Sequence, residues 1–89
     1  MTLCEYHMMA VQYLFCFLAY GYSAKNVWIG KDPNYGLAEG YVKRALGSLH
    51  RLNIIQKEHP QARLQELIIN EVPAIQTFCA EVQKDNKDV

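Results

Sequence analysis

The stretch from Leu3 to Tyr22, at the start of the chain, is the most apolar part of this sequence. Between Met8 and Tyr20 it contains a single polar residue, Gln12. A helix built from this stretch is apolar nearly all round, and such a helix must be covered on more than one side. In a chain of 89 residues we therefore expect this helix to lie at the centre of a small bundle, or to share part of its surface with a partner.

The ends of this first helix are marked by local signals. Thr2 and Glu5 have the spacing of a capping box, which predicts a helix that begins at Leu3. Gly21 and Ser23 predict that it ends near Tyr22. Residues 24–36 are then a connection with a turn at 32–36, where proline, asparagine and glycine suit turn geometry. The apolar residues 27–29 within it are expected to tuck against the bundle or to form a short helical turn.

The apolar start of the chain does not have the pattern of an export signal or a membrane span. A signal peptide has a basic start, whereas Glu5 precedes the apolar run and no lysine or arginine occurs before Lys25. A transmembrane helix needs about 20 apolar residues, and Glu5, His7 and Gln12 interrupt the count. We therefore expect a soluble protein of the cytoplasm with no membrane contact.

Apolar residues at spacings of three and four predict two further helices. One covers about 37–56, and the other starts near Pro60 and contains Pro73, where we expect a kink or a restart at Asn70-Glu71. The predicted face of the second helix consists of Ala38, Tyr41, Val42, Ala45, Leu49 and Leu52. The predicted face of the third consists of Leu64, Leu67, Ile68, Val72, Ile75, Phe78, Cys79 and Val82. The expected fold is an all-α bundle of three to four helices, with one domain at 1–83 and a polar tail at 84–89.

Two glycines, Gly40 and Gly47, lie inside the predicted second helix, where each costs about 1 kcal/mol relative to alanine. They indicate either that another backbone packs closely there or that both positions are exposed and tolerant.

Composition argues against several functional classes. Nine basic and nine acidic side chains balance, whereas domains that bind nucleic acid through phosphates usually have a basic excess. Three cysteines without paired spacing are interpreted as buried thiols in a reducing compartment. His7, His50 and His59 lack the spacing of metal ligands, and no Ser/His/Asp or Cys/His set can be argued from spacing. We expect no enzyme activity, no metal and no cofactor.

The segment from Leu37 to Ile55 resembles the recognition helix of a winged helix-turn-helix domain, followed by the Ile-Ile pair that leads into its first wing strand. The resemblance implies that the polar side chains of this helix face phosphates and base edges. These side chains are Lys43, Arg44, Ser48, His50 and Arg51. The segment before it, Lys31 to Gly36, is a predicted loop where that family has a helix. DNA binding is thus one alternative function.

A second resemblance covers residues 41–76. This part of the chain is similar to the helical hairpin of small immunity proteins that neutralise interbacterial toxins, delivered by type VI secretion or by contact-dependent inhibition. The matching positions are Tyr41, Arg44, Ala45, Leu46, Leu49, Leu52, Pro60, Leu67, Glu71, Ile75 and Gln76. The resemblance implies a non-catalytic protein that binds and inactivates a cognate toxin domain.

The contact residues for such a partner are predicted from physical chemistry. Aromatic residues are favoured at binding hot spots, so Tyr22, Trp28 and Tyr35 are the first candidates. Acidic residues that oppose a basic nuclease toxin are the next: Glu66, Glu71 and Glu81, unless they form only a solvated helix face. A third alternative is a homodimeric scaffold or anti-activator whose N-terminal helices pack together.

Overall fold

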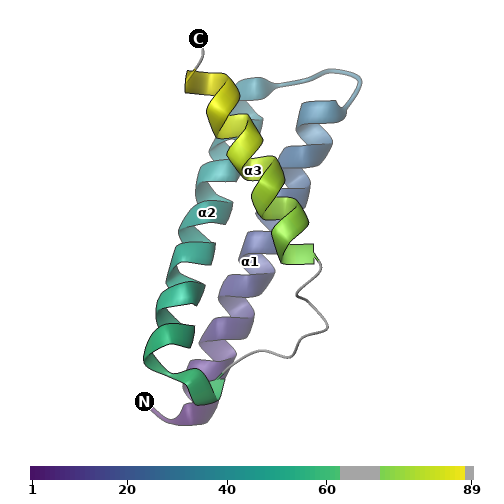
Figure 1. Cartoon of the computed structure of the whole chain (residues 1–89). Coiled ribbons are helices and arrows are strands. Elements are labelled where there is room, and N and C mark those ends of the chain that lie inside the picture. Colours follow the sequence, from purple (N-terminus) through teal and green to yellow (C-terminus); the bar gives the residue numbers. More distant parts are fainter. Residues whose placement is uncertain (63–70, 88–89) are drawn as a thin grey trace.

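The computed structural model describes residues 1–62 and 71–87 of the chain. These residues form α1 (Leu3–Ile29), α2 (Tyr35–Glu58), the 3-10 turn η1 (Pro60–Ala62) and α3 (Glu71–Lys87), with no β-strand among them. The helices α1 and α2 lie side by side in opposite directions (Figure 1). α3 crosses the half of this pair that contains the end of α1 and the start of α2. The molecule is elongated, with extents of 44 × 23 × 20 Å, and the predicted all-helical fold with three helices is confirmed.

The start of α1 is the predicted capping box. The Thr2 hydroxyl accepts a hydrogen bond from the Glu5 N–H at 3.2 Å, and the Glu5 carboxylate accepts one from the Thr2 N–H at 3.4 Å. Two of the amide groups at this end thereby find partners that the helix itself cannot provide.

The end of α1 differs from the prediction. The helix does not stop near Tyr22 but continues to Ile29, for 27 residues in all. Gly21 and Ser23 lie inside the helix and do not cap it. Gly21 is instead the point at which Ile75 of α3 packs against α1. Trp28, expected in a connecting segment, therefore belongs to the last turn of a long helix.

α2 begins and ends at residues with clear local roles. The Asn34 side chain accepts a hydrogen bond from the Leu37 N–H at 3.0 Å, which starts the helix two residues before the predicted position. At the other end, the His59 N–H donates to the Ile55 carbonyl at 2.8 Å. The His59 ring stacks on Tyr6 with 3.6 Å between ring centroids. This contact holds the end of α2 against the start of α1.

α3 begins at Glu71, which agrees with the predicted restart before Pro73. Pro73 lies in the first turn, where an N–H has no partner within the helix, so proline is tolerated there. The helix continues to Lys87, four residues beyond the predicted domain boundary at 83. Leu64, Leu67 and Ile68 of the predicted third-helix face lie outside the described residues.

The core contains residues from all three helices. Phe17 of α1 and Val42 of α2 are completely buried and belong to the same cluster. The predicted apolar face of α2 is buried or half-buried along its length, as are the described members of the α3 face. The buried cluster consists of Ala10, Leu14, Phe17, Ala24, Val42, Ala45, Leu49, Leu52, Ile55, Ile75, Cys79 and Val82.

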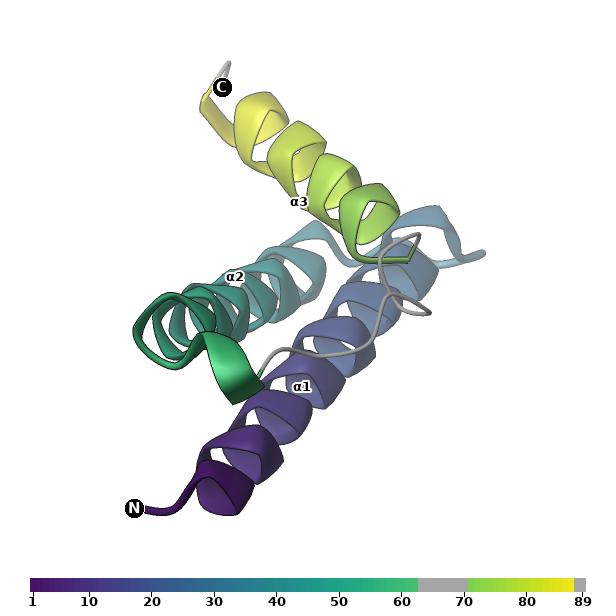
Figure 2. The same ribbon diagram turned by 60° about the horizontal axis from the view of Figure 1, so that its bottom comes forward.

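The predicted central position of α1 is not confirmed, because one side of this helix is open. Phe15 is 73% exposed and Met8 is 56% exposed. Cys4 and Cys16 are also exposed, so the prediction of three buried thiols is correct only for Cys79. Both α2 and α3 pack on the same side of α1 and leave its other side without a covering helix (Figure 2). None of the described helices has the length and hydropathy to cross a membrane.

Candidate functional site

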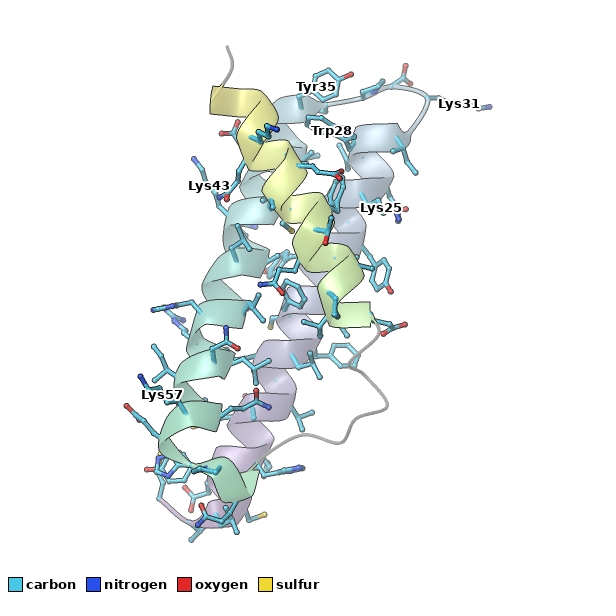
Figure 3. All side chains as sticks on the ribbon, in the orientation of Figure 1. Lys25, Trp28, Lys31, Tyr35, Lys43 and Lys57 are labelled. Atoms are coloured by element: carbon cyan, nitrogen blue, oxygen red, sulfur yellow. The ribbon has the colours of Figure 1, made fainter. Side chains whose placement is uncertain are left out.

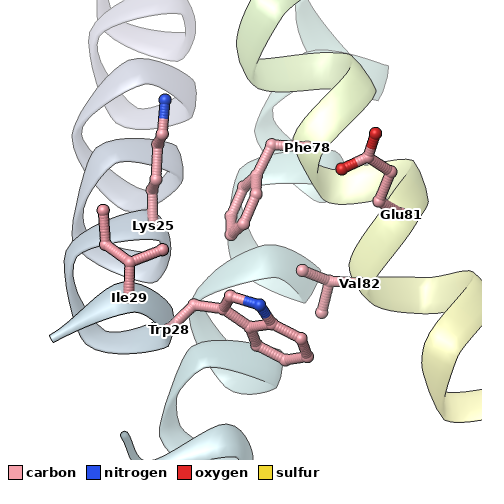
Figure 4. Close-up of a pocket in the computed structure, with 6 residues that line it drawn as sticks. All are labelled: Lys25, Trp28, Ile29, Phe78, Glu81 and Val82. Carbon is pink, nitrogen blue, oxygen red and sulfur yellow. The ribbon is translucent and has the colours of Figure 1, made fainter.

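A pocket of about 220 Å³ lies between the last turns of α1 and the second half of α3. The residues that line it are Lys25, Trp28 and Ile29 from α1, and Phe78, Glu81 and Val82 from α3 (Figure 4). Lys25, Ile29 and Glu81 are exposed, so the pocket opens to solvent. Pockets for cofactors and drug-sized ligands usually measure about 300–1,000 Å³. A site of this smaller size is suited to a side chain that protrudes from a partner.

The wall of the pocket is built around Trp28, whose side chain is half-buried. Its ring meets Tyr35 in an edge-on arrangement with 4.6 Å between centroids. On the other side it meets Phe78, also edge-on, with 6.4 Å between centroids. Edge-to-face geometry is favourable for aromatic pairs. Trp28, Tyr35 and Phe78 form the aromatic cluster, to which each of the three helices contributes one ring.

The aromatic cluster lies at the end of the molecule where α1 joins α2. Figure 3 shows Trp28 and Tyr35 together there, with Lys25 and Lys31 nearby. Trp28 reaches this position because α1 continues through residues 24–29, and Tyr35 because α2 begins directly after the Asn34 cap. The local signals that end one helix and start the next therefore bring the two rings together.

Charges of opposite sign border the pocket. Lys25 projects from α1 and Glu81 from α3, on opposite walls (Figure 4). An ammonium group donates hydrogen bonds and a carboxylate accepts them, so the rim can bind a backbone segment or a mixed-charge surface of a partner.

A second pair of predicted residues meets closer to the middle of α1. The Glu71 carboxylate, at the start of α3, lies near the phenol of Tyr22. Desolvation, together with the charge of Glu71 and its interaction with the phenol, raises the pKa of Tyr22 above its usual value. A neighbouring negative charge disfavours the phenolate, so Tyr22 remains a neutral hydrogen-bond donor. The contact joins the beginning of α3 to α1.

The structure thus divides the predicted contact residues between two places. Trp28, Tyr35 and Glu81 lie at the aromatic end, whereas Tyr22 and Glu71 form the second pair. Glu71 and Glu81 are ten residues apart on one helix, which corresponds to about 15 Å along its axis. Glu66 lies outside the described residues.

Sequence reasoning missed four residues of the pocket: Lys25, Ile29, Phe78 and Val82. Phe78 and Val82 were assigned to the predicted apolar face of the third helix. Tyr22, Lys25 and Ile29 have the spacing of one helical face. That signal was present, but it applies only if the first helix is known to continue to Ile29.

The basic side chains of α2 are largely engaged with the protein itself. The Arg44 guanidinium lies 5.8 Å from the centroid of the Tyr20 ring, and that of Arg51 lies 6.0 Å from the Tyr13 ring. The Lys43 Nζ lies 3.9 Å from Oε1 of Glu39 in an exposed ion pair. The arginines therefore cover tyrosines of α1, which is a packing role.

Within the described residues, no group of three or more His, Cys, Asp and Glu side chains could hold a metal ion. Burial raises the pKa of the Cys79 thiol, which makes it a poor nucleophile.

Comparison of the chain with models of protein families, with curated proteins and with solved structures gives no match.

Proposed function

We propose that this protein is a non-catalytic binding module that holds another protein against its aromatic cluster. The observation that carries the proposal is the position of Trp28, fixed between Tyr35 and Phe78 beside an open pocket. Tryptophan and tyrosine are the residues most enriched at binding hot spots. A partner that inserts one side chain into the pocket would bury Trp28 and the exposed Tyr35 ring together.

The aromatic cluster is arranged in advance for such a contact. Trp28 contacts rings on two other helices, so its side chain has little freedom left to lose when a partner binds. Ordering a flexible side chain at an interface costs about 0.5–1.5 kcal/mol. Because the bundle has already ordered Trp28, more of the contact energy remains available for affinity.

In its most specific form, the proposal is an immunity protein that acts in the cytoplasm by covering the surface of a cognate toxin domain. The similarity of residues 41–76 to the helical hairpin of such proteins supports it. Glu71 and Glu81 are both exposed on α3, where they can oppose a basic toxin surface. Inhibition by covering a surface requires no catalytic group and no cofactor.

Co-expression with a candidate toxin domain, sought in the genes beside this one, tests this proposal. We expect the protein to restore growth and to form a stable complex with the toxin. Trp28→Ala should weaken the complex about 30-fold or more, the equivalent of a hot spot of about 2 kcal/mol.

Tyr35→Ala is the variant that separates binding from folding, because Tyr35 is 56% exposed. It should also weaken the complex while the circular dichroism spectrum is unchanged. Asn53→Ala, at an exposed position of α2 away from the pocket, is the matched control and should bind normally. Full rescue of growth by both aromatic variants, or no complex with the wild-type protein, would refute the proposal.

The DNA-binding alternative has weaker support. A helix-turn-helix joins two helices at about 90–120°, whereas α1 and α2 run alongside each other in opposite directions (Figure 1). Arg44 and Arg51 cover tyrosines of α1, so their binding to phosphate would require these contacts to break. A complex with duplex DNA that weakens steeply with salt would favour this alternative over toxin binding.

A further inference from the structure

Two tyrosine–arginine pairs lie at matching positions along the seam between α1 and α2. Arg44 meets Tyr20 and Arg51 meets Tyr13, with distances of 5.8 and 6.0 Å from the guanidinium carbon to the ring centroid. The two tyrosines are seven residues apart, and so are the two arginines, on helices that run in opposite directions (Figure 1). Attraction between a guanidinium and an aromatic ring therefore holds the arginines at one spacing, about 10.5 Å along the axis of α2.

The hydrogen-bonding capacity of both arginines is unused. A guanidinium carries five N–H donors and no acceptor. Neither Arg44 nor Arg51 has a hydrogen bond or an ion pair with another residue that the structure describes, and both side chains are exposed. Contact with a tyrosine ring leaves these donors free for an acceptor from outside the chain.

The charge around the two arginines has one sign. Between residues 40 and 57, α2 contains lysines and arginines but no aspartate or glutamate. The part of α1 between residues 6 and 29 contains no acidic residue either. Because the whole chain has as many acidic as basic side chains, its charges are segregated. The seam is therefore complementary to an acidic surface.

The surface of α2 beside the arginines is open. Gly40, Arg44, Gly47 and Arg51 recur at spacings of four and three residues, so they share one face of the helix. A Cβ atom added at either glycine would meet nothing within 4 Å. An approaching backbone can therefore come close to α2 between the two arginines.

This face of α2 lies away from α3. The contacts of α1 with α3 include Gly21, against Ile75, and Trp28, against Phe78. Tyr20 comes one residue before Gly21 and thus lies about 100° away from it around α1. The tyrosine–arginine pairs therefore border α2 on the side that α3 leaves open, and they are separate from the aromatic cluster.

We propose that this face of α2 binds an acidic helix of a partner protein, on which two carboxylates seven residues apart are bound by Arg44 and Arg51. Seven residues of the partner helix span about 10.5 Å, which is also the spacing of the two arginines. Both contacts can therefore form at once when the helices lie side by side. A carboxylate accepts two parallel hydrogen bonds from one guanidinium, and Gly47 leaves room for the partner between the two contacts.

An acidic helix fits this face better than nucleic acid does. A protein that depends on phosphate contacts can make about 6–10 of them, whereas this face offers two arginines, and the nearby Lys43 is paired with Glu39. A duplex is wider than a single helix, so the arginines would have to leave their tyrosines to reach its phosphates. The glutamates of a single helix extend toward the seam and reach the arginines in place.

Titration of the full chain with synthetic helical peptides tests the proposal. The probe is an alanine-rich peptide with two glutamates seven residues apart. Its matched control has the same composition with the glutamates five residues apart, which puts them on different sides of the helix. Binding is followed at low salt by the NMR signals of the arginine Nε–H groups. We expect the probe to shift the signals of Arg44 and Arg51 and to bind about threefold or more tightly than the control.

Three outcomes of this titration would overturn the proposal. These are equal affinity for the two peptides, no shift of either arginine signal at millimolar peptide, and a shift of the same signals by duplex DNA at a lower concentration than the probe. The last outcome would assign the face to nucleic acid. Trp28→Ala should leave peptide binding unchanged although it weakens the proposed toxin complex, so either proposal can fail without the other.

Substitutions on α2 separate a specific contact from general attraction between charges. Arg44→Gln and Arg51→Gln should each weaken binding of the probe about threefold or more. Lys57→Gln, the matched control, removes the same charge from an exposed position elsewhere around α2 and should bind normally (Figure 3). Gly47→Leu keeps every charge, so its circular dichroism should remain that of the folded protein while the added side chain blocks the probe. Normal binding by Gly47→Leu, or an equal loss in Lys57→Gln, would contradict the proposed contact.

Discussion

Gly21 of α1 lies directly against the side chain of Ile75 of α3. A Cβ atom added at Gly21 would overlap Cγ2 of Ile75, and it would also come within 3.5 Å of the Ile75 Cβ. Ile75 is 2% exposed, so its branched side chain has no free space into which it could turn. The absence of a side chain at Gly21 is therefore what allows α3 to approach α1.

Gly21→Ala should destabilise the protein. The overlap with Ile75 forces α3 to shift, and overpacking of this kind costs about 1–3 kcal/mol. The substitution also improves helix propensity by about 1 kcal/mol, so the net loss is smaller than the packing cost alone. Urea denaturation followed by circular dichroism measures the change.

Gly40→Ala and Gly47→Ala are the matched controls. A Cβ atom at either position meets nothing within 4 Å, so only the gain in helix propensity remains. Each should stabilise the protein by about 0.5–1 kcal/mol. A stabilised Gly21→Ala variant would show that α3 does not pack on α1 at this position.

Phe17→Ala and Phe15→Ala should differ greatly in their effect on stability, although the two positions are only two residues apart. Phe17 is completely buried, and its truncation should cost about 3–5 kcal/mol, which is close to the whole stability of a small domain. Phe15→Ala, measured under dilute conditions, should change stability by no more than about 0.5 kcal/mol. A large loss of stability for Phe15→Ala under these dilute conditions would contradict the exposure of this side of α1.

The three cysteines should react in two classes. Cys4 and Cys16 are exposed, whereas Cys79 is buried and its thiol pKa is raised by desolvation. We expect a thiol reagent to label two cysteines per chain under native conditions and the third only after unfolding. Mass spectrometry of the labelled peptides identifies the sites, and rapid native labelling of Cys79 would contradict the packing of α3.

Tyr22 should ionise at a higher pH in the folded protein than in the unfolded chain. Its folded pKa is raised by desolvation and by Glu71, so the folded state binds the phenolic proton more tightly. The resulting contribution to stability is present below the unfolded pKa of about 10 and is lost as the pH rises through the folded pKa.

Glu71→Gln should shift the ionisation of Tyr22 partly back toward its usual value. It removes the negative charge but leaves the desolvation, so the return is incomplete. The difference in phenolate absorbance between each protein and its Tyr22→Phe variant isolates this tyrosine from the other five. An unchanged ionisation midpoint in Glu71→Gln would show that the two side chains do not interact.

Part of the candidate site was visible in the sequence. Trp28 and Tyr35 were identified as contact residues because they are aromatic and lie near a turn, and the structure places them in contact with each other. Phe78 and Lys25 were missed, because the pocket forms only where α3 crosses the last turns of α1. A residue on a helix face cannot be assigned to core or pocket until the neighbouring helix is positioned.

The sequence by itself determined the features that depend on local interactions. The capping box at Thr2, the end of α2 before Pro60 and the start of α3 ahead of Pro73 all follow from hydrogen bonding and steric limits within a few residues. The apolar faces of α2 and α3 were equally predictable, because helical periodicity places their apolar residues on one side.

Only the tertiary structure decided how far α1 extends and which of its sides is covered. α1 is apolar almost all round, so its periodicity does not distinguish a buried side from an exposed one. Gly21 has the appearance of a helix end, yet it is the place where Ile75 packs. These outcomes depend on contacts between segments more than fifty residues apart. The position of α3 thereby selects the inner side of α1 and leaves Phe15 on the outer one.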